Sequence, residues 1–232
     1  MRTGHRLLLF DIDGTLLDCG PQVRPLFAGA LEEVFGTAGD VERYDFAGRT
    51  DPGIVFDLLT GAGQPAERIR SLLPRVRDLY LDRLAAGLDG RGIRVLPGVL
   101  EVLSCLAVHG EVTLALLTGN WERGARIKLS HFDLNRFFPF GAFGCDGMVR
   151  SDLPPVALDR AERQLGRRFR PEETLIIGDS LLDVACAQAH GIPVMAVATG
   201  RTPAAALENA GADWVVPDLP AAARVLGWAA AA

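Results

Sequence analysis

The chain has 232 residues, of which 49% are hydrophobic and 23% are charged. This composition is typical of a globular protein with a packed core, and it excludes an intrinsically disordered chain. The formal net charge of -5 provides no basic surface for nucleic acid or for an anionic membrane. The apolar stretch near the N-terminus, residues 7–10, is too short for a signal peptide or a membrane span. We therefore expect a cytoplasmic protein without nucleic-acid or membrane partners, and the sequence leaves its oligomeric state open.

The first apolar run, residues 7–10, is followed directly by Asp11 and Asp13 and then by Gly14 and Thr15. An uninterrupted apolar run is typical of a strand that is buried on both faces. Because side chains alternate along a strand, two carboxylates two residues apart lie on the same side of its end. Gly14 permits a sharp exit from the strand, and the Thr15 hydroxyl can bond within the turn. Such a loop can hold a cation and a phosphate, although a simple aspartate-rich turn has the same sequence pattern.

The pattern becomes helical after this loop. Apolar residues recur at helical spacing in three stretches, 23–35, 52–59 and 66–84. We interpret residues 19–91 as an inserted helical domain. Residues 1–18 and 92–232 then form one α/β core, because strand-like runs return only after the helical stretches end.

The second half of the chain alternates between buried runs and helical runs. Strands are predicted over 112–117, 174–177, 193–198 and 214–216, and helices over 99–108, 123–132, 155–165 and 182–190. The alanine-rich end, residues 221–232, predicts a last helix and a frayed tail. Repeated alternation indicates parallel strands with helices on both faces, that is, a doubly wound α/β sheet. Ligands of such sheets bind beyond the carboxyl ends of the strands.

Three of the predicted strands end in polar residues. Besides the first, the strand over 112–117 ends at Thr118 and Gly119, and the strand over 174–177 ends at Asp179 with Asp183 nearby. A hydroxyl followed by a flexible peptide can present its donors to an anion. Adjacent strands would bring all three ends to one rim, which favours an active site over three unrelated turns.

These segments resemble the motifs of the haloacid dehalogenase (HAD) superfamily, in the phosphatase branch with a helical cap after the first strand. Asp11-Ile12-Asp13-Gly14-Thr15 is similar to the first motif of that family, Thr118 to the second, and residues 178–183 to the fourth. Pro97-Gly98-Val99 and Gly48-Arg49-Thr50-Asp51 also resemble phosphoglycolate-phosphatase-like members. The resemblance implies a Rossmann-like core with an inserted α-helical cap.

The resemblance also implies roles for the matched residues. Asp11 is the expected nucleophile on phosphorus, and Asp13 is the expected general acid. A Mg²⁺ cofactor is expected on the Asp11 carboxylate, the Asp13 backbone carbonyl and Asp179. Thr118 and the backbone N–H of Gly119 are expected to hold the oxygens of the transferring phosphoryl group.

The lysine of the third family motif has no match at its usual place. We expect Arg150 to replace it, and we expect Lys128, the only lysine in the chain, to be a solvated side chain. Asp183 is interpreted as an outer carboxylate that orients the metal or the basic residue, although a helix-capping role fits the same sequence. Arg49 is the candidate for the distal group of the substrate, or else a surface arginine before a helix that Asp51 caps.

The predicted function is a Mg²⁺-dependent phosphoric monoester hydrolase that acts on a small phosphorylated metabolite through an aspartyl-phosphate intermediate. Phosphoglycolate is the first guess for the substrate. Two alternatives stay open, a sugar phosphomutase similar to β-phosphoglucomutase and a non-catalytic regulatory protein on the same fold. A dehalogenase is disfavoured because the resemblance implies that such members lack an acid at the position of Asp13.

Overall fold

The computed structural model describes residues 5–90 and 92–228. Its core is a six-stranded parallel sheet in the order β5-β4-β1-β6-β7-β8. The strands are β1 (Arg6–Phe10), β4 (Val112–Leu117), β5 (Gly141–Ala142), β6 (Thr174–Gly178), β7 (Val194–Val197) and β8 (Trp214–Val216). The predicted doubly wound parallel sheet is confirmed, and the two-residue β5 is the strand of this sheet that the sequence pattern missed.

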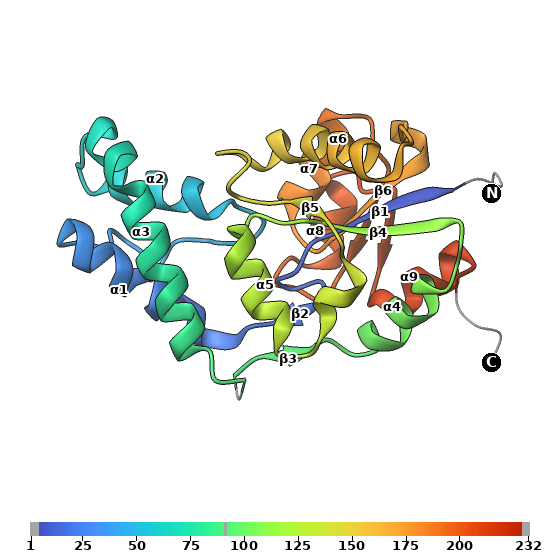
Figure 1. Ribbon diagram of the computed structural model, residues 1–232, viewed down its shortest axis with the longest axis horizontal. Coiled ribbons are helices and arrows are strands. Elements are labelled where there is room, and N and C mark those ends of the chain that lie inside the picture. The colour runs from blue at the N-terminus through green and yellow to red at the C-terminus, as the bar shows by residue number, and fades with distance from the viewer. Residues whose placement is uncertain (1–4, 91, 229–232) are drawn as a thin grey trace.

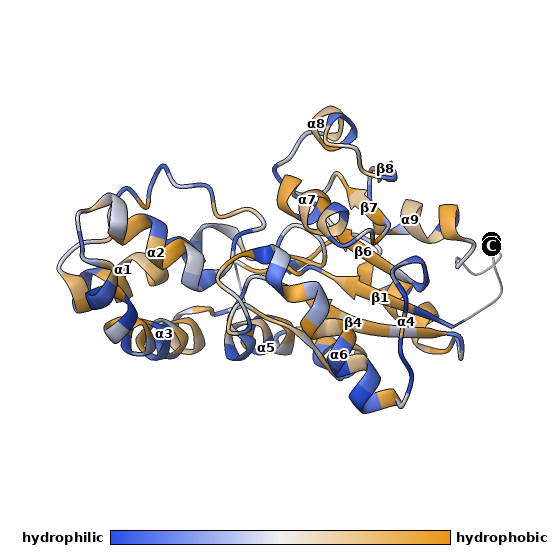
Figure 2. Ribbon diagram, turned by 90° about the horizontal axis from the view of Figure 1, so that it is seen from above, coloured by the Kyte–Doolittle hydropathy of each residue, from blue (hydrophilic) through white to orange (hydrophobic). Residues whose placement is uncertain are grey.

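Alternate residues of the central strand enter two separate apolar layers. Leu8 and Phe10 pack with one set of helices, whereas Leu7 and Leu9 pack with another. The first layer contains α4 (Val99–Ala107) and α9 (Leu219–Leu226), and the second contains α6 (Leu153–Leu165), α7 (Leu181–Ala189) and α8 (Ala204–Asn209). Both faces of the strand are therefore covered, which explains its uninterrupted apolar sequence. Figure 2 shows these central strands in the orange of hydrophobic residues.

Three helices lie together at one end of the sheet, on the left of Figure 1. They are α1 (Val23–Phe35), α2 (Asp51–Gly61) and α3 (Ala66–Gly87), and α3 packs against both others. The chain enters this group of helices through β2 (Leu17–Asp18) and leaves it through β3 (Arg94–Val95). These two short strands pair with each other in antiparallel direction. The helices are where the sequence predicts a cap. The division at residues 19–91 stays a prediction, and residue 91 itself lies outside the described residues.

Several helix boundaries differ from the sequence prediction by a few residues, and two of these differences have a local cause. The hydroxyl of Thr50, rather than the Asp51 carboxylate, caps α2 by accepting a bond from the Gly53 amide at 3.2 Å. The helix predicted from Pro155 begins at Leu153, because prolines fit the first turn of a helix, where their missing N–H is not needed. The predicted tail ends at residues 229–232, which lie outside the described residues. None of the described helices is long and apolar enough to cross a membrane.

The strand order decides where the polar strand ends meet. The central strand β1 pairs with β4 on one side and with β6 on the other, in parallel register. Because all three run in the same direction, their carboxyl ends lie side by side at the rim that faces the helices α1 to α3 (Figure 1). The predicted meeting of the three polar ends is confirmed.

Candidate active site

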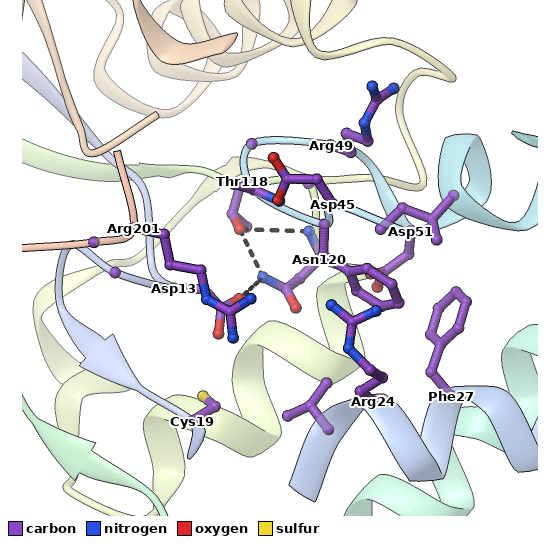
Figure 3. Close-up of a pocket in the computed structure, with 18 of the residues that line it drawn as sticks. Asp13, Cys19, Arg24, Phe27, Asp45, Arg49, Asp51, Thr118, Asn120 and Arg201 are labelled. Atoms are coloured by element: carbon purple, nitrogen blue, oxygen red, sulfur yellow. Dashed lines mark hydrogen bonds between the residues drawn. The ribbon is translucent and has the colours of Figure 1, made fainter. Parts of the chain in front are cut away.

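A cavity of about 660 Å³ lies between this rim and the helices α1 to α3, and residues from both line it. Pockets of this size are typical of small-molecule sites. Figure 3 shows Thr118 and Asn120 from the core facing Arg24, Phe27 and Arg49 across the space. The site therefore combines side chains from the sheet rim with side chains from the inserted helices.

Asp11 occupies the deep end of the cavity, directly after β1, and is 4% exposed. Its amide donates to the Ile177 carbonyl at 2.9 Å, which continues the parallel ladder beyond the strand and fixes the residue. One Asp11 carboxylate oxygen lies 3.2 Å from the guanidinium of Arg150, which is also 4% exposed. The predicted substitution of lysine by Arg150 thus places a buried cation beside this carboxylate.

Arg150 is held by more than Asp11. Its guanidinium lies 2.5 Å from Asp183 Oδ1 and donates to the Leu117 carbonyl at 2.9 Å. The other Asp183 oxygen accepts from the amide and the hydroxyl of Ser180, at 3.0 and 2.6 Å. Asp183 therefore does both things that the sequence leaves open, since it closes the capping box of α7 and also orients Arg150.

Asp11, Asp179 and Asp183 form a cluster of carboxylates whose ligand atoms lie within 4.8 Å of one another. Burial and the charges of Asp11 and Asp183 raise the pKa of Asp179 to about 8. Burial also raises the pKa of Asp11 to about 6, against the opposing effect of Arg150. One arginine is thus insufficient to keep this cluster fully ionised near neutral pH, and the site attracts a further positive charge.

The cluster fits a hard divalent cation such as Mg²⁺, which prefers carboxylate and carbonyl oxygens. Asp179 accepts one hydrogen bond, from the Thr15 hydroxyl at 2.9 Å, and no ion pair joins it to another described residue. The backbone of two loops also closes tightly around it. A Cβ atom on Gly14 would lie 2.4 Å from the Asp179 carboxylate and one on Gly200 would lie 1.7 Å from it. The side chain is therefore fixed in place without a counter-charge from another described residue.

Thr118 and Gly119 follow β4 on the other side of Asp11. Thr118 is fully buried and its hydroxyl accepts from the Asn120 side-chain amide at 2.9 Å (Figure 3). The Gly119 carbonyl accepts from the Asp51 amide at 2.7 Å, so the loop contacts the first turn of α2 directly. The two residues predicted to hold phosphoryl oxygens thus line the same cavity as Asp11.

The Asp13 carboxylate is held by a buried lysine. Lys128, on α5 (Glu122–Ser130), is 2% exposed, and its ammonium donates to the two Asp13 oxygens at 2.9 and 2.6 Å. The same ammonium donates to Asn120 Oδ1 at 2.6 Å, and the Asn120 amide donates to Asp13 at 2.7 Å. The prediction that Lys128 is solvated is wrong, because the helix turns this side chain toward the cavity instead of toward solvent.

The family comparison decides what kind of protein carries this site. Residues 8–197 match the model of the haloacid dehalogenase-like hydrolases. The chain belongs to this family. The match covers every acidic residue of the cluster and both buried cations, so the family assignment and the site concern the same part of the chain.

Named relatives support the assignment. A phosphoglycolate phosphatase from Rhodobacter capsulatus is 30% identical over 207 residues, which cover 88% of this chain and 90% of that protein. Phosphoglycolate phosphatase 1 from Pseudomonas aeruginosa is 29% identical, over 84% of this chain and 70% of that protein. A crystal structure of a predicted phosphatase from Clostridium acetobutylicum shares the fold with a TM-score of 0.73 at 22% identity, over 97% of this chain and 99% of that one. The predicted family is confirmed, and phosphoric monoester hydrolysis agrees with these names.

In this HAD hydrolase, the hydrogen-bonded group of Asp13, Asn120 and Lys128 was only partly predicted. Lys128 shares the buried face of α5 with Gly124 and Ala125, and this position was a usable signal. A further signal was that Lys128 is the only lysine among 24 basic residues, so it stands where arginine is otherwise preferred. Asn120 had no comparable signal, because an asparagine after a strand is common in turns.

Asp51 is a further buried acid that lines the cavity of the HAD hydrolase, and it comes from α2. Its carboxylate accepts from the Trp121 amide at 2.8 Å. Burial raises the pKa of Asp51 to about 7, against the attraction of Lys128 and of this amide. The inserted helices therefore contribute a titratable group as well as apolar surface.

Arg49 lines the cavity as predicted for a substrate-binding residue, but its guanidinium already has partners. It lies 3.1 Å from Asp57 in an ion pair whose side chains are 44% and 50% exposed. It also lies over the ring of Tyr44, 5.2 Å from the ring centre. An exposed pair of this kind is weak enough for a bound anion to replace Asp57.

Proposed function

We propose that this HAD hydrolase is a Mg²⁺-dependent phosphatase that hydrolyses a small phosphomonoester through an aspartyl-phosphate on Asp11. The observation that carries the proposal is the placement of Asp11. It is a buried carboxylate at the floor of the cavity, held by the backbone and faced by a buried arginine. A fixed carboxylate beside a fixed cation is what in-line attack on an anionic phosphoryl group needs.

In the first step an Asp11 oxygen bonds to phosphorus while the ester bond to the leaving oxygen breaks. Arg150, the Thr118 hydroxyl and the backbone N–H of Gly119 hold the phosphoryl oxygens during this transfer. In the second step a water oxygen attacks the same phosphorus, the bond to Asp11 breaks, and inorganic phosphate leaves. The carboxylate of Asp11 is thereby restored.

Asp13 handles the protons of both steps, and Lys128 holds its carboxyl in place. Burial alone would raise the pKa of Asp13, but Lys128 and Asn120 outweigh it and hold this pKa below its usual value. Asp13 is therefore a carboxylate at rest, which suits its second task of taking a proton from the attacking water. For the first task, Asp13 takes up a proton when the anionic substrate binds beside it and passes this proton to the leaving oxygen. Lys128 keeps its own proton because, against the opposing effect of burial, Asp13 raises the pKa of the lysine, and it holds the Asp13 carboxyl in place at 2.6 Å.

Asp11, Asp179 and the Asp13 backbone carbonyl would hold the Mg²⁺ ion, with Asp183 behind them. When bound, the ion supplies positive charge that lets an anionic nucleophile approach an anionic substrate. The raised pKa values of Asp11 and Asp179 support this assignment, because a cation at their carboxylates favours the ionised forms.

Phosphoglycolate is the first substrate to test, because relatives of 30% and 29% identity carry that name. The experiment measures phosphate release from p-nitrophenyl phosphate, phosphoglycolate and a panel of sugar phosphates, with Mg²⁺ and with EDTA. The matched control is Asp11→Asn, which keeps the side-chain shape and removes the nucleophile. Absence of Mg²⁺-dependent release from every substrate would contradict the proposal, and transfer to a second sugar hydroxyl in place of release would indicate a mutase.

A further inference from the structure

We propose that Arg201 is the residue that recognises a second anionic group on the substrate, and that the substrate class is a phosphomonoester that also carries a carboxylate or a second phosphate. This inference rests on the proposed phosphatase function and deepens it. Arg201 lies in the loop that follows β7, in the core and not in the inserted helices. Its position in the cavity, its freedom from partners and its fixed backbone carry the argument.

Five cationic side chains of the described residues line the cavity, and four of them are engaged. Arg150 and Lys128 are bound to the site aspartates. Arg24 donates to the Val41 and Tyr44 carbonyls, and Arg49 is paired with Asp57. The guanidinium of Arg201 makes no hydrogen bond or ion pair with another described residue. It is therefore the cation in this cavity that needs no rearrangement to bind an anion.

The backbone that presents Arg201 is tied to both catalytic loops. The Thr199 hydroxyl donates to the Gly14 carbonyl at 2.6 Å. Gly200 lies so close to Asp179 that a Cβ atom there would meet the carboxylate at 1.7 Å. The two residues before Arg201 thus contact the nucleophile loop and the metal-site carboxylate, and a fixed backbone of this kind positions a side chain for binding.

The burial of the charged side chains indicates which end of the substrate Arg201 contacts. Asp11, Thr118 and Arg150 are each at most 4% exposed, so they hold the transferring phosphoryl group at the floor. Arg201 is exposed, and Figure 3 shows its side chain extending from its loop into the cavity. A substrate whose phosphoryl group lies at the floor would reach Arg201 with its other end. A guanidinium binds carboxylate or phosphate oxygens there with paired N–H donors.

The test uses two substrates that differ in the second charge alone, phosphoglycolate and 2-hydroxyethyl phosphate. In Arg201→Met, the ratio of kcat/KM for phosphoglycolate over that for 2-hydroxyethyl phosphate should fall about tenfold, mainly through KM, because one charge-assisted contact is lost. Arg201→Lys keeps the charge without the paired donors and should lose less. Arg163→Met, on the outer helix α6, is the matched control and should leave the ratio at the wild-type value.

A third substrate, ethane-1,2-diol bisphosphate, distinguishes a carboxylate from a phosphate as the second group, since the preferred one loses more in Arg201→Met. An unchanged ratio would overturn the inference. An equal loss with all substrates would also overturn it, because Arg201 would then hold the transferring phosphoryl group. Calorimetric binding of phosphoglycolate to wild type and Arg201→Met separates this inference from the proposed function, since it needs no turnover. Wild-type binding without hydrolysis would contradict the function alone.

Discussion

The two aspartates of the Asp11-Ile12-Asp13 segment lie beside different buried cations in this protein. Arg150 lies beside Asp11, and Lys128 lies beside Asp13. The two cations come from different segments, one from the turn before α6 and one from α5. Removing either one leaves a carboxylate that has lost its counter-charge, so we expect different and separable effects.

Lys128→Met should lower kcat for phosphoglycolate by roughly 100-fold, the usual contribution of acid–base catalysis. It should also reduce the free energy of unfolding by about 2 kcal/mol, less than for a fully buried pair, because the Asp13 side chain is 41% exposed. Urea unfolding and steady-state kinetics measure the two effects.

The control for that variant is the double change of Asp13→Asn with Lys128→Met. Neutralising both partners removes the unpaired charge, so the double variant should be more stable than the sum of the single effects by about 1 kcal/mol. Strict additivity would show that the ion pair contributes nothing to folding.

Arg150→Met should reduce turnover more than Arg150→Lys does. The planar guanidinium of Arg150 contacts Asp11, Asp183 and the Leu117 carbonyl at the same time. A lysine ammonium keeps the charge near Asp11 but cannot make all three contacts. We expect the methionine variant to lose about 3 kcal/mol of stability, since it leaves buried carboxylates unpaired. Mg²⁺ should restore part of this loss, and thermal melts with and without the ion measure it. Equal melting points of wild type and variant would contradict the assigned ion pairs.

Among the elements, the contact between the β4 loop and the first turn of α2 joins the core to the inserted helices. A Cβ atom on Gly119 would lie 1.9 Å from the Arg49 carbonyl oxygen. Gly119→Ala should therefore push the inserted helices away from the rim and raise KM roughly tenfold by misplacing the cavity walls. Gly110→Ala is the matched control, because a Cβ atom there meets nothing within 4 Å. Similar kinetics for the two variants would show that the contact is unimportant.

For the whole molecule, we expect the free energy of unfolding to change with pH in opposite directions with and without metal. Asp11, Asp51 and Asp179 have pKa values raised from 3.8 to about 6, 7 and 8, so the folded chain holds more protons than the unfolded chain in this window. In EDTA, the free energy of unfolding should therefore fall as pH rises from about 4 to about 8. We expect a loss of at least about 2 kcal/mol, from the 1.36 kcal/mol that each pKa unit carries.

Mg²⁺ should reverse this trend, because it binds the ionised carboxylates and stabilises the folded state most at about pH 8. Urea unfolding at several pH values in EDTA and in Mg²⁺ measures both slopes. Asp179→Asn removes the largest of the three shifts and should flatten the slope in EDTA. Metal-free stability that rises with pH up to about 8 would contradict the raised pKa values.

The elements of this fold were well predicted where the apolar period was long. The sequence predicts α1 at the residues where it occurs, 23–35, and it predicts β4 at residues 112–117. It missed β5, which has two residues and therefore no period. It also placed the cap of α2 one residue late, since Thr50 and Asp51 are both good capping residues and only the backbone angles decide between them.

The order of Asp11, Asp13, Thr118 and Asp179 along the chain, at the ends of apolar runs, was enough to predict the α/β fold and a site at one rim. The resemblance of these segments to the HAD motifs added the prediction of phosphoric monoester hydrolysis. A local apolar pattern indicates which segments are buried strands and where each strand ends. The partners of these residues were decided by the tertiary structure alone. Lys128 reaches Asp13 across 115 positions of sequence, and Arg201 enters the cavity because its loop packs on Gly14 and Asp179. Packing between distant segments decides which charged side chains come into contact. The local sequence pattern contains no information about these contacts.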